Sequence, residues 1–444
     1  MAERATPRRN RLLLAQWAEL LESDAYRRFW FMRLASHGAA NAVTYALLVF
    51  TVRQSASALA TGGLLLTLIV PSAVFGAVAG VVVDRLPRGL ILFLSNVGRA
   101  LLAFALIGAK DSLPSIYAVS LGFGLILQFA TPAEAAVVPH IVRPTKLVAA
   151  NSFINLGTLV SQVLGILVLA PILLKTTDGA PLLFLLVALF GFAAVIITVI
   201  PQFHFAPQND GRGRVTISAA RREFAESWQT LSRDSTAFLG LTLLVVTSIS
   251  ILIMATLLPK FGTAVLEIAP ENLVYVLAPT AVGVFLGLHS VEYLAGRFDK
   301  LATISGAYLL MAGSLIALGL VPATGDFLVS VDPAGLFSAG PLNEQSARIV
   351  ATAAYANLYG FALTVVLTMG RTLLNERIPL AMQGRIFAAQ AVLANMVAIL
   401  PVVLAGLLAD AIGVGVVLIA AGVAALFAAA WSRARTGKLY AQSP

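Results

Sequence analysis

The chain has 444 residues, of which 59% are hydrophobic and 11% are charged, far below the roughly 25% charged residues of a soluble domain, so we expect an integral membrane protein. Its net charge of +9 does not indicate a nucleic-acid partner, because the sequence lacks a basic face with interleaved aromatic residues and its arginines lie between apolar runs. Cysteine is absent, which excludes disulfides, thiolate metal sites and cysteine nucleophiles.

Apolar runs of about 20 residues predict transmembrane helices, and the sequence contains twelve of them. We place them near residues 29–52, 57–83, 90–109, 114–138, 148–174, 181–200, 237–259, 273–295, 302–322, 349–374, 386–409 and 413–431. Tyr26, Phe29 and Trp30 are expected at the membrane interface. Repeated prolines from Pro132 to Pro144 predict a break before the fifth helix.

Positive charge is distributed unevenly between the two sides of the predicted spans. The basic N-terminal stretch is followed by a short apolar run and several acids, so no cleavable signal peptide is expected. Most of the 30 lysines and arginines fall in segments that are cytoplasmic if the N-terminus is inside. This bias predicts a multi-pass protein of the cell membrane with both termini in the cytosol.

The longest cytoplasmic connection follows the sixth span. Ile217, Phe224, Trp228 and Leu231 recur in it near helical spacing, which predicts either an amphipathic helix on the inner leaflet or a soluble linker helix. We therefore divide the chain into a cytoplasmic N-terminal segment, two six-helix halves separated by this linker, and a cytoplasmic tail, at residues 1–28, 29–200, 201–236, 237–431 and 432–444.

A weak internal repeat supports the two halves. The basic segment Arg85–Arg88 after the second span is matched by Arg297–Lys300 after the eighth, and Pro139 and Asn155 are matched by Pro379 and Asn395. The matched positions of the second pair are separated by more residues than the matched positions of the first pair. An insertion in the outer loop 323–347 accounts for the difference.

The loop after the second span reads Gly80-Val81-Val82-Val83-Asp84-Arg85-Leu86-Pro87-Arg88-Gly89. It resembles the loop signature of the major facilitator superfamily, with Pro87 in place of the second glycine and Gly89 in place of the last basic residue. The resemblance implies an all-α membrane protein of twelve helices in two pseudo-symmetric halves, the MFS fold. In that family the loop aspartate approaches the start of the eleventh helix, so we expect a conformational latch made of Asp84, Arg85, Arg88, Arg385, Arg297 and Lys300.

Other stretches resemble the branch that includes enterobactin exporters and macrolide efflux proteins. They are Phe31 to Gly38, Pro71 to Arg88, Thr131-Pro132-Ala133 with Pro139, Ala150-Asn151-Ser152, and Gln383-Gly384-Arg385 with Gly406 to Asp410. That branch implies a multidrug-type antiporter of the inner membrane that exports its substrate in exchange for protons by alternating access. Ala39 stands where many members carry an acid, which argues against a proton carrier on the first helix.

Charges within spans are costly and usually functional. Glu134, near the inner end of the fourth span, is our first candidate for proton coupling, with structural pairing as the alternative. Arg33 lies about one turn into the first span, where we expect snorkelling to the cytosolic face rather than substrate contact. Arg99, in the middle of the third span, requires a carboxylate or several carbonyls nearby.

His289 and Glu292 share a face of the eighth span and are further proton-coupling candidates. The alternative for Glu292 is an ion pair with Arg297. A metal site would require a third ligand that the sequence does not place, so we expect no metal.

Uncharged polar residues lie on the helices that form the cavity in the resembling family. Some will connect helices by hydrogen bonds, and the candidates for a substrate cavity are Asn41, Tyr45, Gln128, Asn155, Gln162, Tyr355, Tyr359, Gln390 and Asn395. Few acids and many apolar side chains favour an amphiphilic, lipophilic or weakly cationic substrate. The sequence contains no phosphate-binding loop, catalytic triad or metalloprotease helix, so we expect neither an enzyme nor a cofactor.

The sequence thus predicts a monomeric, proton-coupled exporter of drug-, siderophore- or macrolide-like small molecules, with protons and the lipid bilayer as its other partners. The alternatives are an uncoupled facilitator or lipid flippase, and a receptor-like membrane protein that does not transport.

Overall fold

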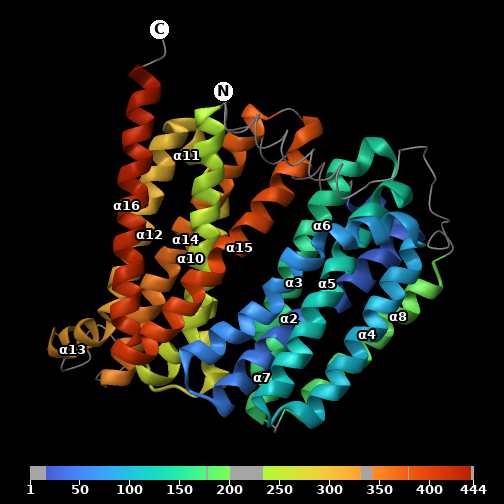
Figure 1. The fold of residues 1–444 in the computed structure, drawn as a ribbon, viewed down its shortest axis with the longest axis horizontal. Helices are drawn as coiled ribbons and strands as arrows, with labels where there is room; N and C mark the ends of the chain where they lie inside the picture. The colour runs from blue at the N-terminus through green and yellow to red at the C-terminus, as the bar shows by residue number, and fades with distance from the viewer. Residues whose placement is uncertain (1–16, 177–178, 201–233, 332–342, 379, 442–444) are drawn as a thin grey trace. The chain divides into compact units, whose positions relative to one another are not determined.

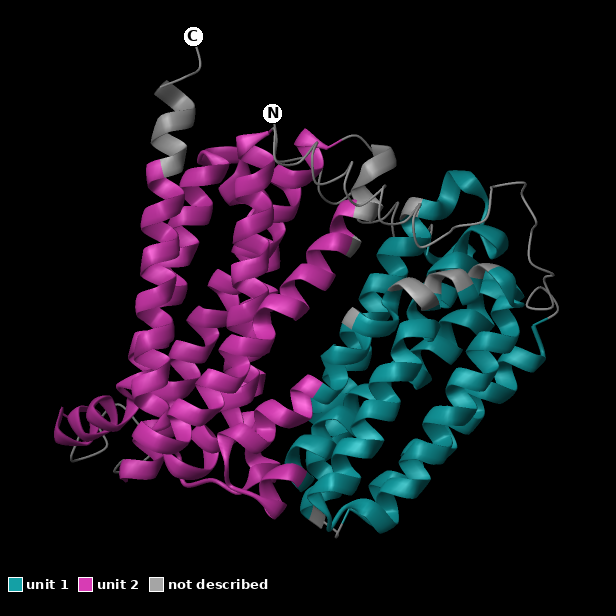
Figure 2. Ribbon diagram, viewed as in Figure 1, with its two compact units in different colours: residues 1–50, 67–215 teal, residues 51–66, 216–444 magenta. Residues whose placement is uncertain are grey.

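The computed structural model describes residues 17–176, 179–200, 234–331, 343–378 and 380–441, and these form helices with short connections (Figure 1). Contacts divide the chain into two compact units (Figure 2). Unit 1 comprises residues 1–50 and 67–215, and unit 2 comprises residues 51–66 and 216–444. The segment Thr51–Leu66, which contains the end of α2, the connection at 55–57 and the start of α3, therefore belongs to unit 2.

Unit 1 is built around antiparallel helices whose apolar sequences satisfy their own backbone hydrogen bonds, as the interior of a bilayer requires. Helix α4 packs against α5 and α8. The helices that begin or lie in this unit are α2 (Asp24–Gln54), α3 (Ala58–Arg85), α4 (Arg88–Ala109), α5 (Leu113–Ile141), η1 (Pro144–Lys146), α6 (Leu147–Gln162), the π-helical η2 (Val163–Leu169), α7 (Ala170–Thr176) and α8 (Ala180–Thr198).

Unit 2 contains the remaining helices. Helix α11 packs on α14, α12 packs on α14 and α16, and α10 packs on α15. The helices are α10 (Ser235–Ala264), η4 (Pro270–Asn272), α11 (Val274–Arg297), α12 (Lys300–Gly319), α13 (Val321–Val331), α14 (Glu344–Arg377), α15 (Leu380–Ile412) and α16 (Val414–Ala441).

The predicted all-α class is confirmed, and each of the twelve predicted spans lies in a long helix or, for the fifth, in the run α6–η2–α7. Eleven helices of the described chain are long and apolar enough to cross a membrane. The remaining span, α2, is more polar because it carries residues such as His37, Asn41 and Tyr45. The predicted amphipathic helix between the halves lies outside the described residues.

One local prediction is confirmed and another needs correction. Helix α5 continues through Pro132 and Pro139 but ends at Ile141, and η1 begins at Pro144, so the break before the fifth span falls within the predicted Pro132–Pro144 region. The outer loop expected at 323–347 contains most of a short helix, α13, and α14 begins at Glu344. The inserted segment is therefore partly helical.

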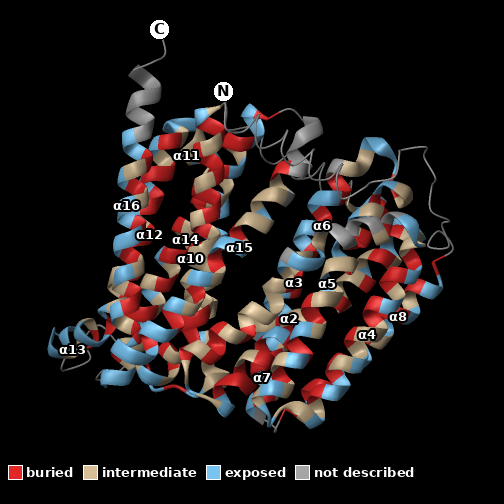
Figure 3. Cartoon of the chain, viewed as in Figure 1, coloured by how far each residue is buried: buried red, intermediate tan, exposed pale blue. Residues whose placement is uncertain are grey.

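Aromatic residues at the start of α2 pack against α6. Tyr26 and Phe29 have no exposed surface, and Figure 3 shows buried residues along the helices of unit 1. The Tyr26 hydroxyl donates to the carbonyl of Ala150 at 2.9 Å, and the ring of Trp30 stacks on Phe153 of α6 with centroids 4.9 Å apart. Helix α6 therefore covers this face of α2, and a position of these aromatic residues at the membrane interface stays a prediction.

Close packing of α11 on α14 depends on small residues. A Cβ atom added at Gly287 would lie 2.9 Å from the carbonyl oxygen of Phe361 and 2.9 Å from the side chain of Thr364. Without a hydrophobic driving force between helices in lipid, such close backbone approach supplies much of the packing attraction.

Candidate functional site

Unit 1 contains a cluster of buried polar and charged residues contributed by three helices. Arg33, Ser36 and His37 lie on one face of α2, three and four residues apart. Arg99 comes from α4 and Glu134 from α5. We call these five residues the Glu134 cluster.

One carboxylate oxygen of Glu134 contacts two basic side chains of α2. Its Oε2 forms an ion pair with Arg33 Nη1 and lies 2.8 Å from His37 Nε2. The Glu134 side chain is 5% exposed, whereas those of Arg33 and His37 are 19% and 24% exposed. The acid is thus buried behind two basic groups that have partial access to solvent.

Arg99 occupies the other side of the cluster and is 3% exposed. Its Nη1 donates to Ser36 Oγ at 2.9 Å, and Ser36 Oγ donates in turn to Asn96 Oδ1 at 2.7 Å. Arg99 is also close enough to Glu134 for their charges to interact. A hydrogen-bonded chain therefore connects α2 and α4 beside the Glu134 carboxylate.

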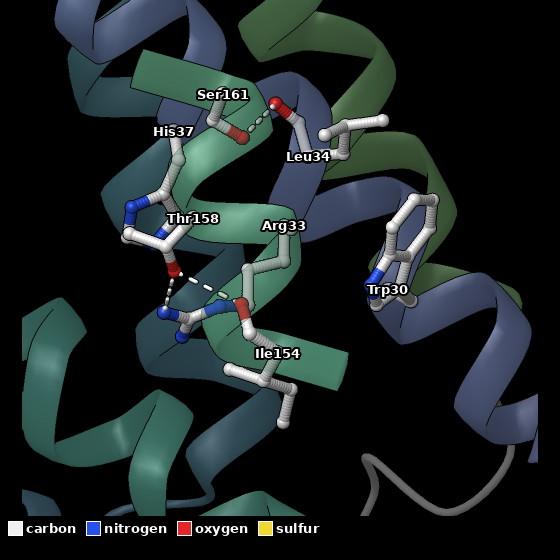
Figure 4. A pocket seen from close by; sticks show the side chains of 8 residues that line it. Trp30, Arg33, Leu34, His37, Ile154, Thr158 and Ser161 are labelled. Atoms are coloured by element: carbon white, nitrogen blue, oxygen red, sulfur yellow. Dashed lines mark hydrogen bonds between the residues drawn. The ribbon is translucent and has the colours of Figure 1, made fainter. Parts of the chain in front are cut away.

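A narrow hollow lies next to the cluster, between α2 and α6 (Figure 4). It is lined by Trp30, Arg33, Leu34, His37, Ile154, Gly157, Thr158 and Ser161. Arg33 Nη2 donates to Thr158 Oγ1 at 3.3 Å across it, and Ser161 Oγ donates to the carbonyl of Leu34 at 3.2 Å. The basic side chains of the cluster therefore face this hollow as well as Glu134.

The segment η2, which follows α6, approaches α2 closely. A Cβ atom added at Gly165, in the π-helical segment η2, would lie 2.8 Å from Asn41 Cβ and 3.0 Å from the backbone nitrogen of Ala42. Single π-helical turns within α-helices are frequent at functional sites.

The structure changes the interpretation of the charges within spans. Snorkelling of Arg33 is not observed, because its guanidinium is held by Glu134 and Thr158. The partners required by Arg99 are the Ser36 hydroxyl and the nearby Glu134 charge. Sequence reasoning singled out Glu134 but missed His37, although its spacing of four residues from Arg33 is a signal that could have found it.

The predicted latch residues have other partners where the structure describes them. Arg88 donates to the carbonyl of Ala136 at 3.2 Å and contacts His140, both on α5. Lys300 pairs with Glu376. Arg85 and Arg297 are exposed, and the side chains of Asp84 and Arg385 lie outside the described part, so the latch stays a prediction.

His289 and Glu292 lie on the exposed side of α11 and are not part of the Glu134 cluster. Asn155 and Gln162 are also exposed, on α6, and Tyr45 is buried on α2.

Other predicted cavity residues bond to their own or neighbouring helices. In unit 1, Asn41 Nδ2 donates to the carbonyl of His37 at 2.9 Å and Gln128 Nε2 to that of Gly124 at 3.1 Å.

In unit 2, Tyr359 is hydrogen-bonded to Ser250 at 3.2 Å, and Gln390 Nε2 donates to Ser248 Oγ at 3.5 Å. Tyr355 and Asn395 are partly buried. These contacts connect helices, and a role in substrate binding stays a prediction.

A second polar centre lies in unit 2 around Asp410, near the end of α15. Its Oδ1 accepts from the backbone N–H of Ala58 at 2.8 Å and from Lys260 Nζ at 2.6 Å. Its Oδ2 accepts from the backbone N–H of Leu59 at 3.2 Å and from the Ser57 hydroxyl. Asp410 therefore caps the N-terminus of α3.

Eleven long apolar helices in the described chain, with charges buried between them, define a multi-pass membrane protein. The family model of the Major Facilitator Superfamily matches residues 29–340, and the chain belongs to this superfamily. It is accordingly a membrane transporter by family and fold. The predicted superfamily is thereby confirmed, and the particular branch stays a prediction.

Solved transporter structures share the fold at low sequence identity. The nucleoside transporter NupG has a TM-score of 0.69 and 11% identity, with 93% of this chain and 99% of that chain covered. The POT family transporter PepTSo has a TM-score of 0.67 and 14% identity, covering 94% and 99%. A bacterial homologue of the iron transporter ferroportin, in an inward-facing state, has a TM-score of 0.65 and 16% identity, covering 92% and 98%. No curated protein matches the chain in sequence.

Proposed function

We propose that this chain is a proton-coupled secondary transporter in which Glu134 carries the proton. The observation that supports this most strongly is a carboxylate buried inside a membrane-spanning helix, in contact with Arg33 and His37. An ionisable group at such a position is expensive and is a functional-site hypothesis by default.

The geometry suggests how a proton could reach and leave the carboxylate. His37 Nε2 lies 2.8 Å from Glu134 Oε2 and is the more exposed of the two groups, so it is placed to pass a proton from the hollow to the acid. Protonation of Glu134 would end its ion pair with Arg33. The neutral acid and the released guanidinium would then favour a different packing of α2, α5 and α6, which is the kind of local change that alternating access requires.

The cargo that we propose is an amphiphilic small molecule, exported in exchange for protons. The resemblance to the exporting branch and the apolar composition of the spans support this direction and this cargo. We also propose that the protein is a monomer in the cell membrane and that both termini lie in the cytosol, because most lysines and arginines lie on that side in this topology.

Purified protein in liposomes tests the proposal. A thermal-stability screen first selects a stabilising amphiphile as cargo, and its flux is then measured with an imposed pH gradient and in counterflow without one. Glu134→Gln should abolish flux driven by the pH gradient and spare counterflow. Asp111→Asn, in the exposed connection after α4, is the matched control.

Each alternative has its own outcome. Counterflow without any response of the wild type to the pH gradient would indicate a facilitator, and movement of labelled lipid alone would indicate a flippase. Binding without either kind of flux would indicate a receptor-like protein. Loss of gradient-driven flux in Glu292→Gln but not in Glu134→Gln would move the proton carrier to α11.

A further inference from the structure

The Glu134 cluster contains more positive than negative charge. Arg33 and Arg99 contribute two fixed positive charges, and Glu134 contributes one negative charge. The other acids of unit 1 whose side chains the structure describes are Glu19, Glu22, Asp24 and Asp111, and none of them is part of the cluster. Among the described residues, one buried positive charge thus lacks a carboxylate of its own, which is costly in a low-dielectric interior.

Arg99 also has unused hydrogen-bonding capacity. A guanidinium carries five N–H donors, yet Ser36 is its one hydrogen-bond partner among the described residues, although the side chain is 3% exposed. On the other side of Glu134, Arg33 and His37 line the hollow together with the Thr158 hydroxyl (Figure 4). Positive charge therefore lies on both sides of Glu134, and the hollow itself is lined by two basic side chains and by no acid.

We propose that the hollow beside Arg33 binds an anionic group, a carboxylate or a phosphate, through Arg33 and His37. The planar guanidinium suits both, because it presents paired N–H donors to two oxygens. Glu134 neutralises only one of the two arginines, so the buried positive charge of Arg99 adds to the attraction for an anion. The hollow is narrow in this structure because Arg33 is turned to Glu134, so the site opens when that ion pair separates.

Proton and anion binding should then reinforce each other. The charged and titratable groups around Arg33 are Tyr26 and His37 on α2, Arg99 on α4 and Glu134 on α5, and α6 has no charged residue. A proton on Glu134 releases Arg33 to the anion, so the anion binds more tightly as the pH falls, by up to about tenfold per pH unit for one proton.

This pH dependence rests on the proposed role of Glu134, whereas anion binding itself does not. If the anionic group is part of the cargo, cargo and proton would cross the membrane in the same direction. In proton exchange they would cross in opposite directions. An inorganic anion that stays bound as a co-ion would leave the direction of cargo flux unchanged. The sign of the pH-driven flux of an anionic probe therefore distinguishes the two sources of the anionic group.

Binding to the purified full-length protein in detergent tests the site. The probes are sodium benzoate and sodium phosphate, with tetraphenylphosphonium as a cationic comparison, each titrated at pH 6 and pH 8 by calorimetry. We expect benzoate, which is ionised at both pH values, to bind at least about tenfold more tightly at pH 6. Phosphate gains negative charge between pH 6 and pH 8, so it reports binding and not the pH dependence. In Glu134→Gln the affinity at pH 8 should approach the wild-type affinity at pH 6.

The double variant Arg33→Gln with Glu134→Gln removes both members of the buried ion pair. Because no single member is left behind without its partner, the variant should keep the fold. We expect it to lose at least about tenfold in anion affinity, while Lys175→Gln, an exposed cation on α7, changes nothing.

Unchanged anion binding in the double variant, or binding of the cation but of neither anion in Glu134→Gln, would overturn the proposal. Anion binding without any gradient-driven flux would instead refute only the proposed transport function. Gradient-driven flux of an uncharged amphiphile with no anion binding would refute only the anion site.

Discussion

Replacing Asp410 by alanine should expose the start of α3. The first N–H groups of a helix have no partner within the helix, and here the N–H groups of Ala58 and Leu59 both donate to the Asp410 carboxylate. The next N–H, of Ala60, donates to Ser57 Oγ, and that hydroxyl also contacts Asp410. Asp410→Ala therefore removes two acceptors directly and weakens the third.

The magnitude follows from the kind of contact. Loss of a side-chain cap costs about 0.5–2 kcal/mol, and loss of a negative charge at a helix N-terminus costs a further 0.3–1 kcal/mol or so. The Asp410 side chain is 27% exposed, so its charge is partly screened. We expect a total of about 2 kcal/mol, which is roughly a 30-fold change in the local opening equilibrium.

Hydrogen exchange of peptides that cover residues 55–62 is the appropriate assay, because it reports local opening rather than global unfolding. Asp410→Ala should exchange roughly 30-fold faster there, and Asp410→Asn, which keeps one oxygen acceptor, about fivefold faster. Lys260→Met is the control, since it removes the ion pair but neither amide contact. Wild-type protection of Ala58 and Leu59 in Asp410→Ala would refute the capping role, and equal loss in Lys260→Met would attribute the protection to the ion pair.

Three further predictions concern other parts of the chain. Asp84→Asn should weaken the predicted latch by about 1.4 kcal/mol, raising cytoplasmic accessibility to a labelled cysteine and slowing export about tenfold while ligand affinity is kept; unaltered accessibility would contradict the latch. Gly165→Leu should lower thermal stability by about 1–3 kcal/mol because it meets the backbone of α2, whereas Gly191→Leu, where a Cβ meets nothing within 4 Å, should be nearly neutral. Tyr308→Phe should cost about 1 kcal/mol because its buried hydroxyl donates to an α10 carbonyl at 2.7 Å, and the exposed Tyr293→Phe should not; equal melting temperatures would argue against that bond.

The amino-acid sequence determined the helices of this protein. Whether a run of about 20 apolar residues crosses a bilayer depends on its own length and composition. Because the backbone N–H and C=O groups in lipid must be hydrogen-bonded within the protein, such a run forms a helix. The tight connections are local as well: α3 ends at Arg85 and α4 begins at Arg88, and α11 ends at Arg297 and α12 begins at Lys300, as the short charged segments predicted.

The partners of the polar residues were decided by the tertiary structure. Arg33 pairs with Glu134, 101 residues away, and Asp410 caps α3 from 352 residues away, contacts that depend on how each helix is rotated about its axis. An apolar helix in lipid has no sharp amphipathic pattern from which that rotation could be read: α10, for example, has apolar residues on all sides. For the same physical reason, Tyr26 could be recognised as an aromatic residue at a helix start, but only the packing of α6 showed that it is buried.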